Sequence, residues 1–98
     1  MIFHIANRDA LAAAKKTGLY EADSLHTEGF IHTSKAEQVA GVRERYYKGH
    51  TGLILLHIDE SKLTSPLKYE NAPSVNELFP HVYGPINMSS VVKEEELV

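Results

Sequence analysis

Four histidines fall on or beside segments whose composition predicts β-strands, and they are the first candidates for chemistry. They are His4, His32, His57 and His81. A neutral imidazole can accept or donate a proton near pH 7 or bind a metal ion. Because strand side chains project alternately to two faces, several of these rings can converge on one cleft if their strands are neighbours.

A metal site is the first chemistry to test against these histidines. Ligand histidines commonly occur as a close pair, such as two histidines four residues apart on a helix, and the chain has no such pair. The absence of cysteine excludes disulfides, thiolate nucleophiles and zinc–thiolate sites. We therefore predict no metal site.

His32 lies in the stretch GFIHTS, two residues before Ser34. Ser34 and Glu37 have the spacing of a capping box, which predicts a helix start there. Exposed helix amides attract anions and favour a neutral imidazole. The stretch suits a phosphorylated or ribose-bearing ligand, with Ser34 or the amides binding an oxyanion and His32 binding a hydroxyl or carbonyl. The alternative is that His32 only ties the strand to the helix, and the two readings weigh equally.

Glu70 and Tyr83 are two further candidates, each with an ordinary alternative. Tyr83 precedes Gly84 and Pro85, where a rigid turn can hold a ring over a flat ligand, although packing is the safer interpretation. Glu70 is either a solvated residue of an edge strand or a carboxylate that stabilises an oxocarbenium-like centre or orients a nucleophile near His32.

The elements that must position these residues follow from periodicity and capping residues. A first helix is predicted between the cap Asn7 and Gly18, and a second between Ser34 and about Tyr47. The second carries an apolar stripe expected to face the core. The connection 18–29 has no sustained period and is predicted to be a surface loop. Strands are predicted at 2–5, 53–58, 67–71, 81–83 and 89–97, the second of them central and buried on both faces. The glutamate run of the last segment could equally form a frayed helix.

This order of elements predicts the fold class. It lacks the regular alternation of a parallel α/β fold, so we expect an α+β fold with two main helices and a twisted, mixed or largely antiparallel sheet. A length of 98 residues predicts one domain spanning 1–98.

Composition limits the partners. A formal net charge of −3 with scattered basic residues argues against duplex nucleic acid. The longest apolar run, 53–56, is too short to cross a bilayer, and residues 1–5 do not resemble a secretory signal. We therefore expect a soluble cytoplasmic protein without membrane contact, and leave its oligomeric state open.

Several motifs together resemble a known family. The stretches SLHTEGFIHTSKAEQV, GLILLHID, LKYE and LFPHVYGPIN, in this order and spacing, resemble the bacterial domain-of-unknown-function family 952. The resemblance extends from the opening FHI through Tyr20 to Val91. One departure is Thr33, where the family often has cysteine.

The resemblance implies a compact ADP-ribosyltransferase-like fold, the scaffold of enzymes that cleave the nicotinamide–ribose bond of NAD. It implies that His32 binds the ribose, Tyr83 stacks on nicotinamide and Glu70 assists transfer. With the motif residues considered above, the candidate catalytic residues are His32, His81 and Glu70, and the candidate ligand-binding residues are His32, Ser34, Tyr83 and Tyr20. No cofactor is assigned with certainty, and NAD is a candidate substrate. The expected function is glycosyl or ADP-ribosyl transfer on NAD or a related nucleotide. The alternatives are a non-catalytic module for a nucleotide or small anion, and a structural or interaction domain.

Overall fold

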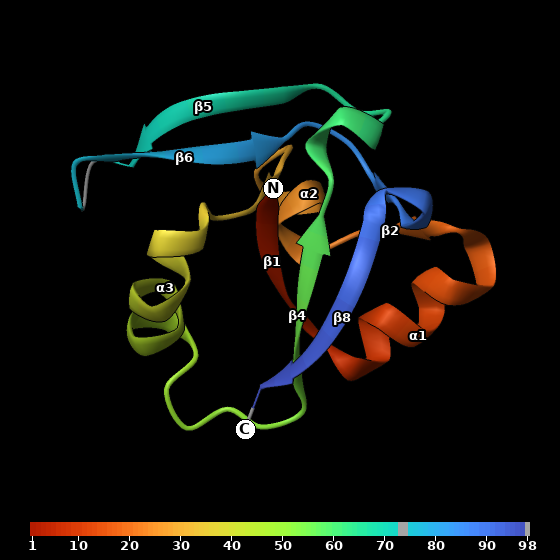
Figure 1. Ribbon diagram of the computed structural model, residues 1–98, viewed down its shortest axis with the longest axis horizontal. Coiled ribbons are helices and arrows are strands. Elements are labelled where there is room, and N and C mark those ends of the chain that lie inside the picture. Colours follow the sequence, from red (N-terminus) through yellow and green to blue (C-terminus); the bar gives the residue numbers. More distant parts are fainter. Residues whose placement is uncertain (73–74, 98) are drawn as a thin grey trace.

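The central sheet is antiparallel, with the strand order β1-β4-β8. Its strands are β1 (Ile2–Asn7), β4 (Leu53–Ile58) and β8 (Val91–Leu97) in the computed structural model, which describes residues 1–72 and 75–97. Figure 1 shows α1 and α3 on opposite sides of this sheet. The predicted central strand and last strand are both confirmed.

β4 is apolar along its length because both of its faces are covered. Alternate side chains point to opposite faces of a strand. Ile54 and Leu56 pack in the cluster that contains Leu11 and Ala14 of α1, whereas Leu55 packs in a second cluster with Val42 of α3. A run without polar alternation is the expected sequence of such a strand.

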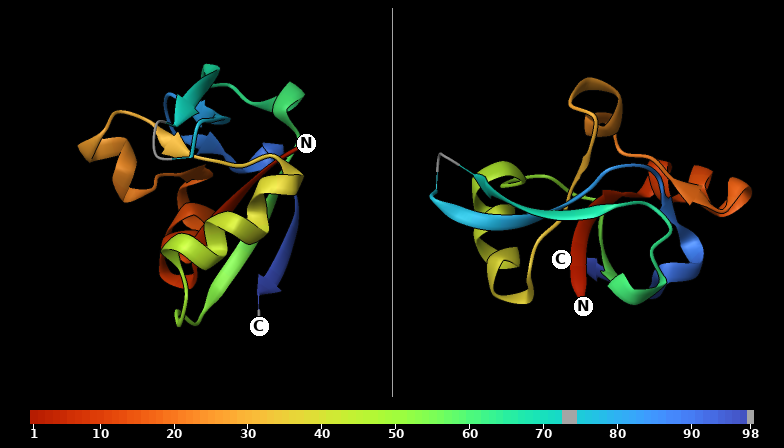
Figure 2. Two further views of the ribbon diagram at one scale, coloured as in Figure 1. Left: turned by 90° about the vertical axis from the view of Figure 1, so that its left-hand side faces the viewer. Right: turned by 90° about the horizontal axis from the view of Figure 1, so that it is seen from above.

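A second antiparallel sheet has the order β3-β6-β5, and a two-residue ladder joins β2 to β7. The predicted edge strand at 67–71 is confirmed as β5, and the strand predicted at 81–83 is longer than expected. The strands are β3 (Ile31–His32), β5 (Leu67–Ala72), β6 (Glu77–Val82), β2 (Leu19–Tyr20) and β7 (Ile86–Asn87). The two strands of the β5–β6 hairpin extend over α3, as both Figure 1 and Figure 2 show. The expectation of one sheet is therefore corrected to separate antiparallel sheets.

The first helix is confirmed as α1 (Arg8–Thr17). The Asn7 side chain accepts a hydrogen bond from the Ala10 N–H at 2.7 Å, and Gly18 ends the helix at a φ of 83°. These caps are local, so the sequence specifies them directly. Among the described residues, no helix is long and apolar enough to cross a membrane.

The second helix begins later than predicted. The chain first forms the 3₁₀ turn η1 (Ala36–Gln38) and then α3 (Val39–Tyr46). Ser34 does not cap it, because its N–H and C=O pair with Phe3 at 2.7 and 2.8 Å and hold it in an extended bridge two residues before the first turn. The Gln38 side chain instead accepts from the Lys35 N–H at 2.9 Å. A backbone pairing to a distant strand has replaced the local cap.

The predicted apolar stripe of this helix is only partly core-facing. Val39, Val42 and Tyr47 pack against the cluster of Ile5, Leu53 and Leu55, but they remain partly exposed. Tyr46 points away from the core and is 60% exposed. This leaves one side of α3 available to line a cavity.

The connection 18–29 is not an irregular surface loop. It contains β2 and the short helix α2 (Asp23–Thr27). Tyr20 of β2 is 2% exposed and belongs to the main core cluster. The remaining short turns are η2 (Glu60–Lys62) and η3 (Met88–Ser90).

Candidate functional site

The pairing of β3 with β6 places His32 directly opposite His81. Their ring centroids are 5.4 Å apart and their planes are nearly perpendicular, at 78°. One histidine comes from the GFIHTS stretch and the other from FPHVYGP. Two stretches almost fifty residues apart thus supply adjacent imidazoles.

Phe30 connects the two imidazoles. Its ring stacks on His81 with centroids 4.1 Å apart and 22° between the planes, and it meets His32 edge-on at 4.8 Å. Phe30 lies just before β3 and two residues before His32, and both rings contact the ring of His81. Phe30 was not among the predicted site residues, although its spacing of two residues from His32 was visible in the sequence.

A cavity of about 550 Å³ opens between α3, β1 and the β3-β6-β5 sheet. His32 and His81 both line it, as does Ser34, whose hydroxyl has no hydrogen-bond partner among the described residues. Its volume lies in the range of small-molecule sites. The lining also includes Phe30, Phe79, Val42, Arg45, Tyr46, Asn71 and Glu28.

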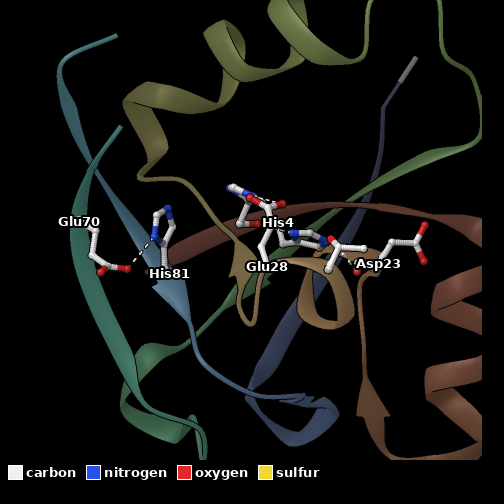
Figure 3. A network of polar contacts seen from close by, with 7 residues as sticks. His4, Asp23, Glu28, Glu70 and His81 are labelled. Carbon is white, nitrogen blue, oxygen red and sulfur yellow. Dashed lines mark hydrogen bonds and ion pairs between the residues drawn. The ribbon is translucent and has the colours of Figure 1, made fainter. Parts of the chain in front are cut away.

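A carboxylate holds His81 from outside the cavity. Figure 3 shows Glu70 of β5 beside His81 of β6, and the Glu70 Oε1 to His81 Nδ1 distance is 2.9 Å. A carboxylate can only accept, so Nδ1–H is the donor. The Tyr83 hydroxyl donates to the same oxygen. These bonds from Tyr83 and His81 lower the pKa of Glu70, and the bond to Glu70 raises the pKa of Tyr83.

The second nitrogen of His81 is therefore the one available to a ligand. With the proton on Nδ1, the neutral ring presents Nε2 as an acceptor. Nε2 has no partner among the described residues, although the side chain is only 10% exposed. His81 thus combines a fixed tautomer with a free basic nitrogen on a cavity wall.

His32 is arranged differently. Its Nε2 lies 3.0 Å from Oε2 of Glu28, and both side chains are about half exposed. His32 does not lie at a helix start as predicted, because Ser34 is bridged to Phe3 and the first turn begins at Ala36. His32 is therefore a solvent-accessible imidazole at the cavity wall, without help from a helix dipole.

His4 supports the backbone of His32 from the core. Its Nδ1–H donates to the His32 carbonyl at 2.6 Å, and its Nε2 accepts from the Tyr20 hydroxyl at 3.0 Å. Burial lowers the pKa of His4 to about 4, so the ring is neutral at pH 7. Burial also raises the pKa of Tyr20. The pair is a satisfied core network.

The candidate residues therefore fall into two groups. His32, His81 and Ser34 line the cavity. Glu70 contacts His81 from behind the cavity, Tyr83 donates to Glu70, and Tyr20 lies behind His4. His57 belongs elsewhere, with its Nε2 2.9 Å from Glu95. Within the described residues no cluster of histidine and carboxylate side chains could hold a metal ion.

A wider and more open hollow of about 660 Å³ lies against another face of α3. It is lined by Ala40, Arg43, Glu44 and Tyr47, and His50 is the histidine at its edge. None of the paired imidazoles reaches it. We therefore place the candidate site in the cavity that contains His32 and His81.

Comparisons with known proteins identify relatives without an assigned activity. A family model described as "Protein of unknown function (DUF952)" matches residues 5–94. The crystal structure of protein CC0527 from Caulobacter crescentus superposes with a TM-score of 0.90 at 33% identity, covering 99% of this chain and 85% of that one. Its solution NMR structure gives a TM-score of 0.83 at 33% identity, covering 98% and 83%. No curated protein matches the chain.

Proposed function

Because the chain belongs to the DUF952 family of unknown function, we propose its function from the site: the cavity binds a nucleotide of the NAD or ADP-ribose class and catalyses glycosyl transfer. The observation that carries this proposal is the pair of opposed imidazoles, His32 and His81, on the wall of one cavity. Two adjacent imidazoles can contact a ribose and its leaving group at the same time. The choice of ligand rests on the resemblance of the motifs to ADP-ribosyltransferase-like scaffolds, which is an analogy of fold.

In this proposal His81 is the acid–base residue. Its Nε2 would accept the proton of the attacking hydroxyl, and Glu70 would stabilise the imidazolium through Nδ1–H. The hydroxyl oxygen would form a bond to C1′ of the ribose while the bond from C1′ to the nicotinamide nitrogen breaks, and neutral nicotinamide would leave with that electron pair. A carboxylate behind a histidine fixes its tautomer and orientation, as in hydrolase triads. Glu70 is then a positioning residue that acts through His81. The sequence suggested instead that Glu70 contacts the ribose directly.

The other candidates take supporting roles. His32 and the free Ser34 hydroxyl would bind the ribose hydroxyls of the ligand. Tyr83 would hold Glu70 in place, and Tyr20 would hold His4, which in turn fixes the His32 carbonyl. Phe30 would take the aromatic role that the sequence analysis gave to Tyr83, because it already stacks on His81 at the cavity wall.

Ligand binding can be tested by NMR titration of the imidazole resonances with NAD and ADP-ribose. We expect His32 and His81 to shift with saturable dependence on ligand, while His26, which lies outside the cavity lining, does not move. His26 is thus an internal control in the same spectrum. If millimolar ligand shifts neither cavity histidine, the proposed function is wrong.

A non-catalytic binding module is the second candidate, and one observation favours it. Glu70 is outside the cavity lining and already accepts two hydrogen bonds, so no carboxylate from β5 faces the ligand. Glu70→Gln separates the two functions when binding and release of nicotinamide from NAD are measured together. If the protein is an enzyme, the wild type releases nicotinamide, and Glu70→Gln keeps its affinity for NAD but loses this turnover. If it is a binding module, the wild type and Glu70→Gln both bind NAD and neither releases nicotinamide.

A further inference from the structure

The cavity extends beyond the two histidines toward the tip of the β5–β6 hairpin. Asn71, which lines it, pairs with Leu78 on β6, three positions before His81. Three residues along a strand correspond to about 10 Å. Arg45 and Tyr46, in the last turn of α3, line the same cavity. The walls therefore include side chains that the proposed chemistry at His81 does not use.

Arg45 is the one permanent cation among the described residues of the cavity lining, and Glu28 is the one carboxylate. Glu28 is paired with His32. Arg45 has no carboxylate within ion-pair distance among the described residues, and its guanidinium carbon lies 5.8 Å from the centroid of the Tyr46 ring. The Tyr46 ring is itself exposed. A free guanidinium beside an exposed aromatic ring thus borders the cavity.

Gly41 explains how the guanidinium is accommodated. It lies within α3 and has no positive φ, so the backbone conformation does not require glycine. A Cβ placed on Gly41 would lie 3.0 Å from Nη1 and 3.7 Å from Cζ of Arg45. Glycine inside a helix is destabilising relative to alanine. The space that this glycine leaves is occupied by the Arg45 head group, one turn further along the helix.

We infer that Arg45 forms a phosphate subsite of the cavity, and that the ligand is phosphorylated, of the nucleoside diphosphate class. A guanidinium presents planar, paired N–H donors that match two phosphate oxygens. The exposed Tyr46 ring beside it offers an apolar face to a base or ribose. This assignment rests on the proposed function for the identity of the reacting end, but the phosphate subsite can be tested without it.

The first test compares ligands by isothermal titration on the wild type, Arg45→Gln and Lys48→Gln. Lys48 is the matched control, because it lies close by, carries the same charge and pairs with Glu44 outside this cavity. Arg45→Gln should weaken ADP-ribose and inorganic pyrophosphate about tenfold. Lys48→Gln should leave both affinities within about twofold. Adenosine, which has no phosphate, should bind weakly and equally to all three proteins.

The second test uses Gly41→Ala, which we expect to raise Tm by a few degrees because alanine favours the helix. The same variant should weaken pyrophosphate about threefold or more by displacing the Arg45 head group. A more stable protein that binds less well cannot be explained by damage to the fold. Equal affinity of Gly41→Ala and wild type would overturn the role given to Gly41.

The outcomes separate this inference from the proposed function. If ADP-ribose shifts His32 and His81 but binds equally to wild type and Arg45→Gln, the function stands and the phosphate subsite is wrong. If pyrophosphate binding depends on Arg45 while ADP-ribose leaves the histidines unmoved, the subsite stands and the proposed function is wrong. If the wild type binds neither probe at millimolar concentration, both are wrong.

Discussion

Acidification should destabilise the protein through His4. The perturbation is a change from about pH 7.5 to about pH 4.5, made on the wild type and on His4→Asn. His4 is 6% exposed, and burial lowers its pKa from 6.5 to about 4. The folded state therefore binds fewer protons than the unfolded state between these two values. Falling pH then favours unfolding.

The magnitude follows from the two pKa values. The neutral His4 ring makes its full contribution to the free energy of unfolding above pH 6.5, its pKa in the unfolded state. This contribution is lost as the pH falls from 6.5 toward 4, and it changes no further at lower pH. One unit of difference corresponds to about 1.4 kcal/mol, so the full loss is about 3 kcal/mol. At about pH 4.5 the two-state titration gives about 2.5 kcal/mol of it. This is a large part of the stability of a small domain.

The assay is urea unfolding at several pH values, with the wild type and His4→Asn measured side by side. The substituted amide side chain cannot titrate, and it leaves the Tyr20 hydroxyl without its acceptor, so this variant should be about 1–3 kcal/mol less stable at neutral pH. All other groups titrate in both proteins and cancel in the difference. The stability of the wild type minus that of the variant should therefore fall by about 2.5 kcal/mol at the acidic end, which closes or reverses the gap seen at neutral pH.

His26→Asn is the control, because His26 is exposed and its ion-pair partner is the exposed Glu21. Its stability should follow that of the wild type across the whole pH range. A gap between wild type and His4→Asn that stays constant on acidification would refute the reasoning, because it would mean that the buried ring keeps an ordinary pKa. A His4 proton resonance that titrates near pH 6.5 would refute it independently.

Three further predictions concern the carboxylate of Glu70, the cap of α1 and the buried core. Glu70→Gln should lower the pKa of Tyr83, because the charged acceptor that raises it is removed; an ultraviolet absorbance titration, read against Tyr83→Phe, reports this, and an unchanged tyrosine would contradict the Glu70–Tyr83 bond. Asn7→Ala should cost about 1 kcal/mol in urea unfolding by removing the cap of α1. Leu56→Ala should cost about 2–5 kcal/mol, since Leu56 is fully buried in the core cluster shared with α1, and a loss below 1 kcal/mol would contradict that packing.

Local signals in the sequence determined several elements. Asn7 and Gly18 bracket α1 because a cap needs only its own turn of helix. The apolar run of β4 indicated a strand covered on both faces, because an uninterrupted run has no side to offer to water. The motif histidines could be recognised as candidates from residue type and resemblance alone. These features do not depend on which distant segment lies beside them.

Other features were decided only by tertiary structure. Ser34 does not cap a helix as predicted, because its backbone pairs with Phe3 in an extended bridge. Tyr20, which was predicted to lie in a surface loop, is buried in the core beside His4. The His32–His81 pair exists because β3 pairs with β6 in one register, and a shift by one residue would turn His81 to the other face. Pairing partners and register are set by long-range packing, so no window of the sequence contains them. The sequence alone identifies the residues that could do chemistry, and the tertiary structure determines which of them lie next to one another.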